Sequence, residues 1–219
     1  MSIERLLRRP GLEPRVRLLV TGLVAIWRAD WPTLGAAAKA AQDRSLPRAD
    51  LEEMLLQSVL FCGFPRAVTA FEQLGEVWPA ASPPTGGALP AAEQGAAGRQ
   101  LFSAIYGRNA AAVDAMLAGF HNEFRSFVLD VAYGRILTRP GLSGHDRELL
   151  AVAALAASDQ RRQFAGHARG ALHLGATRTV LREVLTTVFT DESTVEAWCQ
   201  RIPSPDATPT EGPGGQGKS

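Results

Sequence analysis

The chain has 219 residues, 46% of them hydrophobic, which is enough for one large domain or two small ones with a real core. Its 23 basic and 22 acidic residues give a formal net charge of +1, and no run of like charges occurs. This balance argues against nucleic acid or a membrane surface as a partner.

The most apolar stretch, residues 18–27, is about half as long as the ~20 residues that cross a bilayer. Because Arg17 and Arg28 flank it, we interpret it as a buried helix. The N-terminus lacks the pattern of a secretory signal, so a cytoplasmic location is expected. Cys62 and Cys199 are far apart, and no histidine cluster has ligand spacing, so we expect neither a metal nor another cofactor. Cys62 lies among apolar residues and is interpreted as an inert thiol.

Apolar residues recur at intervals of three and four, and no clean alternation is visible, which predicts an all-α fold. The periodic segments predict helices over 13–28, 33–43, 48–61, 64–78, 97–105, 109–135, 143–157, 160–173 and 177–190. Residues 79–97 are rich in Pro, Ala and Gly and are interpreted as a linker. Residues 203–219 carry almost nothing apolar and are interpreted as a disordered tail.

An internal repeat organises the rest of the chain. Residues 9–60 align on 139–190 at a fixed offset of 130 without a gap, and 12 positions are identical. Chance similarity between two Ala/Leu-rich stretches explains several apolar matches but hardly the contiguous Arg-Pro-Gly-Leu that opens both. We therefore predict two related helical units, at 1–78 and 98–202.

Glu148 and His167 form the pair that is most able to carry chemistry. If residues 158–160 join their helices as an antiparallel hairpin, the two side chains face each other. A carboxylate that accepts the proton of one imidazole nitrogen fixes the tautomer and raises the basicity of the other nitrogen, as a proton shuttle requires. The first unit has Leu18 and Ala37 at these positions. Joint replacement favours a shared task, although a buried structural hydrogen bond would co-vary in the same way.

Several motifs resemble the carboxymuconolactone decarboxylase family, which includes the alkylhydroperoxidase D-like proteins. They are Tyr-Gly-Arg-Ile-Leu-Thr-Arg-Pro-Gly-Leu at 133–142, Arg-Glu-Leu-Leu at 147–150, Gly-His-Ala-Arg at 166–169 and, in the first unit, Gln-Ser-Val-Leu-Phe-Cys-Gly-Phe-Pro at 57–65. The resemblance covers about 9–78 and 98–190. It implies an antiparallel helical bundle of the alkylhydroperoxidase D-like type that assembles as a homo-oligomer.

The resemblance also separates two kinds of chemistry. Where the peroxidase branch has its Cys-x-x-Cys pair, this chain has Gln160 and Gln163, which argues against thiol peroxidase activity. The decarboxylase branch implies a cofactor-independent lyase that acts on a small carboxylated lactone or related acid. In that case His167 is the acid and Glu148 orients it.

The resemblance makes Arg139, Arg147 and Arg169 candidate binders of the substrate carboxylates. His145 is a further candidate substrate-binding residue, although a polar residue is ordinary in the first turn of a helix. The second unit lacks its own closing helix, so either the helix predicted at 64–78 completes its site or the site is incomplete. The alternative to an enzyme is a non-catalytic member that oligomerises or binds a small molecule.

Overall fold

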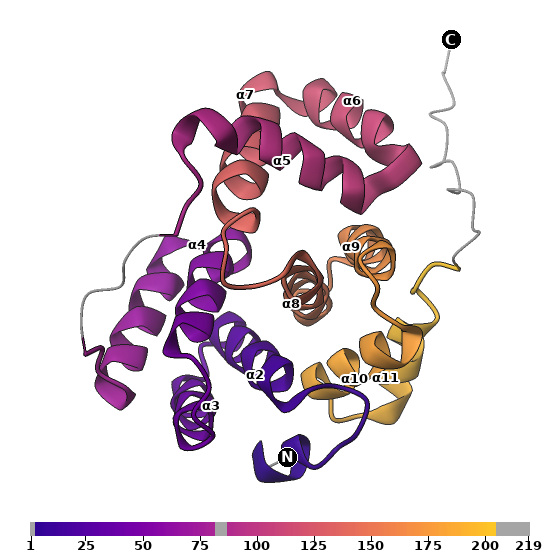
Figure 1. Ribbon diagram of the computed structural model, residues 1–219. Coiled ribbons are helices and arrows are strands. Elements are labelled where there is room, and N and C mark those ends of the chain that lie inside the picture. The colour runs from indigo at the N-terminus through magenta and orange to yellow at the C-terminus, as the bar shows by residue number, and fades with distance from the viewer. Residues whose placement is uncertain (1–2, 82–86, 205–219) are drawn as a thin grey trace.

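The computed structural model describes residues 3–81 and 87–204. These residues form helices and no strand, which confirms the predicted all-α class. Part of the linker prediction (82–86) and most of the tail prediction (205–219) lie outside the described residues. In Figure 1, α5, α6 and α7 make one layer, α8 lies in the middle, and α2 to α4 and α10 to α11 lie on its other side.

The first unit contains α1 (Ile3–Leu7), α2 (Pro14–Arg28), α3 (Trp31–Asp43) and α4 (Arg48–Val77). Proline opens α2 and α3, where its missing N–H is no loss, and the Asp30 carboxylate accepts the Thr33 N–H at 3.1 Å to cap α3. Helix α4 is divided at Gly63, whose φ of 75° and ψ of 169° are not helical. This division agrees with the predicted boundary between two helices there.

The second unit contains α5 (Ala91–Tyr106), η1 (Gly107–Asn109), α6 (Ala110–Phe120), α7 (Asn122–Ser126), the π-helix η2 (Phe127–Leu137), α8 (Gly144–Ala157), α9 (Arg161–His173), α10 (Arg178–Val188) and α11 (Glu192–Cys199). Two predictions are wrong here. The single helix expected over 109–135 is broken at His121, which is extended and accepts the Glu123 N–H on its own ring. The expected linker is shorter, because α5 already begins at Ala91.

The two units have the same order of helices at the offset of 130 residues. Helices α2, α3 and the first half of α4 correspond to α8, α9 and α10. The turns correspond as well: Gly11 and Gly141 have φ of 83° and 105°, and Ala29 and Asp159 have φ of 55° and 54°. The same backbone path is therefore used twice.

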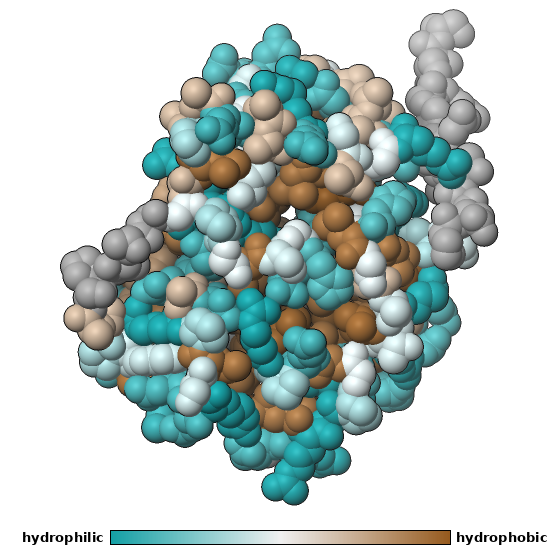
Figure 2. All heavy atoms as spheres, viewed as in Figure 1, coloured by the Kyte–Doolittle hydropathy of each residue, from teal (hydrophilic) through white to brown (hydrophobic). Residues whose placement is uncertain are grey.

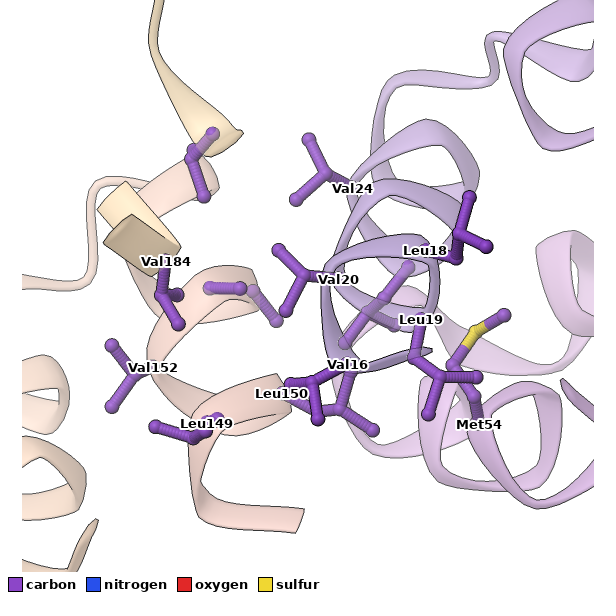
Figure 3. Close-up of a cluster of buried hydrophobic side chains, with 14 of the residues drawn as sticks. Val16, Leu18, Leu19, Val20, Val24, Met54, Leu149, Leu150, Val152 and Val184 are labelled. Carbon is purple, nitrogen blue, oxygen red and sulfur yellow. The ribbon is translucent and has the colours of Figure 1, made fainter. Parts of the chain in front are cut away.

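Both units contribute to one hydrophobic core. In Figure 3, Val16 and Val20 of α2 lie opposite Leu149 and Leu150 of α8, with Val184 of α10 beside them. All five of these residues are at most 4% exposed. A second, smaller cluster consists of Phe102, Ile105, Leu117, Leu129, Tyr133 and Leu137 and lies under α5 and η2. The units therefore pack as one body, and α8 contributes Leu149, Leu150 and Val152 to the larger cluster.

Helix α4 is long and apolar enough to cross a membrane, by length and composition alone. Core helices of soluble proteins pass the same test. The break at Gly63 and the buried polar side chains of Asp50, Glu53 and Gln57 agree with a core helix here. Beyond the break, Phe64 and Val68 are exposed.

Candidate active site

Glu148 of α8 and His167 of α9 are in direct contact. The Nδ1 atom of His167 lies 2.9 Å from Oε2 of Glu148, a hydrogen bond in which the ring N–H donates to the carboxylate. The two helices form the antiparallel hairpin that the sequence predicts, and Asp159 takes the left-handed conformation in the short turn between them. The geometry therefore leaves Nε2 as the nitrogen that can exchange a proton with another molecule.

The absence of a side chain at Gly170 leaves the space in which the Glu148 carboxylate lies. A β-carbon added at Gly170 would lie 2.6 Å from Oε2 of Glu148 and 2.6 Å from Cγ2 of Ile105, closer than real β-carbons approach. The backbone of α9 thus passes directly over the carboxylate. The equivalent residue of the first unit is Ala40, where no such carboxylate is present.

The pair is desolvated but not sealed. Glu148 is 1% exposed and the His167 side chain is 14% exposed. Burial alone would lower the pKa of His167, but the charge of Glu148 and its hydrogen bond outweigh burial and raise the pKa above its ordinary value. His167 is therefore suited to carry a proton near neutral pH. The second carboxylate oxygen of Glu148, Oε1, is buried and has no hydrogen-bond partner among the described residues.

Two tyrosines border the pair, and the sequence analysis did not single them out. The Tyr106 ring centroid is 6.2 Å from that of His167, and the Tyr133 hydroxyl donates to the Tyr106 hydroxyl at 3.1 Å. Burial raises the pKa of Tyr106, and it raises the pKa of Tyr133 further, so both phenols stay neutral. Tyr133 lies within the family motif at 133–142, but no sequence signal marks Tyr106.

In the first unit, apolar side chains occupy the positions equivalent to Glu148 and His167. Leu18 and Ala37 stand where Glu148 and His167 stand in the second unit, and they are 4% and 2% exposed. The same helix hairpin is therefore stable without a polar pair.

Arg139 and Arg147 bind a carboxylate of the protein itself. Both donate to Glu53 of the first unit, at 2.8 Å from each Nη2, and Arg147 is 1% exposed. The contact is repeated in the other direction, since Arg9 and Arg17 bind Glu183 of the second unit. Each unit thus holds the glutamate of the other. We assign these arginines to the contact between the units, in place of the substrate-binding role that the sequence suggested.

The other two candidate substrate-binding residues, Arg169 and His145, differ in whether their side chains already have a partner in the protein. Arg169 is partly exposed on α9, two residues from His167, and no described residue forms a hydrogen bond or ion pair with it. His145 lies at the start of α8, where its Nδ1 atom is 3.2 Å from Oδ1 of Asp146, in a cleft whose lining includes neither Glu148 nor His167. Of the four candidates, Arg169 is therefore the one whose side chain has no such partner among the described residues, although two positions from His167 it points to a different side of α9.

Neither the two glutamines at the positions of the peroxidase Cys-x-x-Cys pair nor Cys62 supplies a reactive thiol beside Glu148 and His167. Gln160 and Gln163 are exposed at the start of α9. Burial raises the pKa of Cys62 to about 11, although Arg66 opposes this, so the thiol is protonated at neutral pH. No hydrogen bond or ring contact of the described residues joins 64–77 to Glu148 or His167. In the part of the chain that the structure describes, no group of three metal-binding side chains gathers.

Comparison with known proteins agrees with this arrangement. Residues 122–197 match the model of the carboxymuconolactone decarboxylase family. Peroxisomal protein 2 of Schizosaccharomyces pombe is 28% identical over 174 residues, which are 77% of this chain and 82% of that protein. The 4-carboxymuconolactone decarboxylase of Acinetobacter baylyi is 32% identical over 69 residues, 32% of this chain and 52% of that protein. The chain thus spans about half the length of that decarboxylase.

The fold and the site define an all-helical protein with a carboxylate-histidine pair between two antiparallel helices. The matched segment runs from α7 to α11 and contains both Glu148 and His167. Over residues 122–197 the chain has the sequence pattern of the carboxymuconolactone decarboxylase family.

Proposed function

We propose that the protein is a cofactor-independent lyase that removes carbon dioxide from a small carboxylated lactone or a related acid. The observation that carries this proposal is the 2.9 Å contact between His167 and the buried Glu148, which leaves Nε2 of the ring uncommitted among the described residues. The similarity to a 4-carboxymuconolactone decarboxylase supports the reaction class.

The reaction requires a carboxylate to leave as carbon dioxide and its electron pair to move into the lactone as an extended enolate. His167, charged through its contact with Glu148, then donates the Nε2 proton to carbon and regains one from solvent. Arg169, on the same helix and without a hydrogen bond to the described residues, is the residue proposed to bind a second carboxylate of the substrate. Tyr106 and Phe102 belong to the apolar layer over the ring, and a dry site favours loss of charge from the carboxylate.

The test is carbon dioxide release and loss of lactone absorbance with 4-carboxymuconolactone as the probe. Wild type, His167→Ala and the control His121→Ala are compared; His121 is an exposed helix-cap residue. We expect turnover in wild type and in the control, and a loss of about 10²- to 10⁴-fold in His167→Ala. Equal turnover in His167→Ala and wild type would remove His167 from the mechanism.

A non-catalytic member of the family is the second candidate. The low exposure of His167 favours it, because a pair buried for structure alone would have the same geometry. In that case no acid substrate turns over in wild type, while the protein still binds a small molecule or a second copy. The relative with the longer match, Peroxisomal protein 2, has no activity in its name.

The oligomeric state and the cellular location of the protein are also proposals. Phe64, Phe120, Phe124 and Phe127 are 49% to 71% exposed, which suits burial in a homo-oligomer. Figure 2 shows apolar side chains at the border between the α5 layer and the helices beneath it. For location, the sequence suggests the cytoplasm, whereas the name of the yeast relative places that protein in the peroxisome. Sedimentation of the protein and fractionation of its source cells test these two proposals.

A further inference from the structure

A cleft of about 480 Å³ lies where the two units meet, between α2, α8 and α10. In Figure 1, α2 and α10 lie below α8, and the chain before α2 runs across this region. The cleft has an apolar floor and a polar rim, and its lining residues are Gly11, Leu12, Glu13, Val16, His145, Asp146, Leu149 and Val180. Its size is that of a small-molecule site.

The internal repeat identifies the side chain that occupies the position equivalent to this cleft on the other side of the molecule. At the offset of 130 residues, His145 corresponds to Arg15 and Val180 corresponds to Asp50. Arg15 donates to Asp50 at 2.6 Å and to Asp146 at 2.8 Å. In the first unit an aliphatic stem with a cationic end therefore occupies this position. In the second unit the imidazole of His145 replaces that side chain, Val180 replaces its carboxylate partner, and a cleft is open there.

The charges at the open cleft also favour a cation. The exposed carboxylate of Glu13 has no hydrogen bond from the described residues, and it makes no cap contact with α2. Asp146 also lines the cleft; its Oδ2 accepts from Arg15, and its Oδ1 lies 3.2 Å from Nδ1 of His145. The apolar floor, which includes Leu12 and Leu149, is therefore bordered by the carboxylate of Glu13, which has no hydrogen bond from the described residues, and by that of Asp146, which already contacts Arg15 and His145.

We propose that this cleft binds a small organic cation, a guanidinium or primary ammonium group on a short apolar body. The apolar body packs on Leu12, Val16, Leu149 and Val180, and the cation lies between Glu13 and Asp146, as Arg15 does between its two carboxylates on the other side. The site is independent of the proposed lyase activity, because its lining includes neither Glu148 nor His167.

The test is a titration of the full chain with butylguanidinium, followed through the methyl NMR signals of Leu12, Leu149 and Val180. Butylurea, which is uncharged, and valerate, which is anionic, are the matched probes. We expect saturable shifts with butylguanidinium and at least fivefold weaker binding of the other two. Tighter binding of valerate, or no saturable shift with butylguanidinium, would overturn the proposal.

Two variants locate the site. Glu13→Lys places a cation at an exposed rim position and is expected to abolish binding, whereas Glu76→Lys, at an exposed position of α4, is expected to leave binding unchanged. The double variant His145→Arg/Val180→Asp rebuilds the arrangement of Arg15 and Asp50 and is expected to close the cleft. Unchanged binding in Glu13→Lys would overturn the proposal even if the double variant does not fold.

Discussion

The protein has two helix hairpins, α2 with α3 and α8 with α9. Their backbones follow the same path, but the side chains buried between the helices are apolar in the first hairpin and polar in the second. The first hairpin buries Leu18 against Ala37, and the second buries Glu148 against His167. Desolvating a carboxylate and an imidazole is unfavourable, and the apolar hairpin shows that the fold does not need them. The difference supports the proposal that the polar pair serves a purpose other than stability.

What the two units share is equally informative. Each supplies two arginines to one glutamate of the other unit, Glu53 or Glu183. These contacts are alike in both directions, although the interiors of the hairpins differ. The contact between the units is therefore the common structural element, and the pair at His167 is particular to the second unit.

The largest expected effect is on this shared contact. Glu53→Ala leaves Arg147, which is 1% exposed, without its carboxylate and is expected to lower the free energy of unfolding by about 3–5 kcal/mol. Glu183→Ala should have a similar effect through Arg17. The control is Asp43→Ala, which removes an exposed pair with Lys39 and should change stability by less than about 0.5 kcal/mol. Urea denaturation measures all three, and equal stability of Glu53→Ala and the control would contradict the assignment.

The next prediction converts the second hairpin into the first. His167→Ala leaves a buried carboxylate unpaired and is expected to cost roughly 1–3 kcal/mol of stability. The double variant Glu148→Leu/His167→Ala copies Leu18 and Ala37 and is expected to be at least as stable as wild type while having no lyase activity. A double variant that is less stable than His167→Ala would show that the pair supports the fold.

A matched pair of glycine substitutions tests the room around Glu148. Gly170→Ala places a β-carbon 2.6 Å from the carboxylate, so an overpacking cost of about 1–3 kcal/mol should exceed the helical gain of up to about 1 kcal/mol. At Gly166, on the same helix, the nearest atom is Tyr106 Cε1 at 3.5 Å, an ordinary contact. Gly166→Ala should therefore be stabilising. Thermal unfolding that ranks the two variants in the opposite order would contradict the close approach at Gly170.

The smallest expected effect is a pH dependence of the second hairpin. Because the folded pKa of His167 is raised, its contribution to stability is complete below the unfolded pKa and is lost as pH rises through the folded pKa. Between about pH 6 and pH 9, wild type should lose about 1 kcal/mol or less relative to Glu148→Leu/His167→Ala. Urea denaturation of both proteins at several pH values measures it, and a difference that does not vary with pH would count against the raised pKa.

The sequence predicted the helices of both hairpins well because their periodicity and turn residues are local signals. It also paired Glu148 with His167, because a short turn fixes which residues face each other across an antiparallel hairpin. It did not reveal that Arg147 binds Glu53, since that contact joins residues 94 positions apart and depends on how the two units pack. The break at His121 was missed because a histidine carries no strong signal for ending a helix.

The most direct test of the account is an NMR titration of His167 in wild type and in Glu148→Gln. The account predicts a pKa above 6.5 in wild type, because the carboxylate outweighs burial. It predicts a pKa below 6.5 in Glu148→Gln, because burial then acts without an opposing charge. A pKa below 6.5 in wild type, or the same pKa in both proteins, would contradict the claim that Glu148 makes His167 a proton carrier.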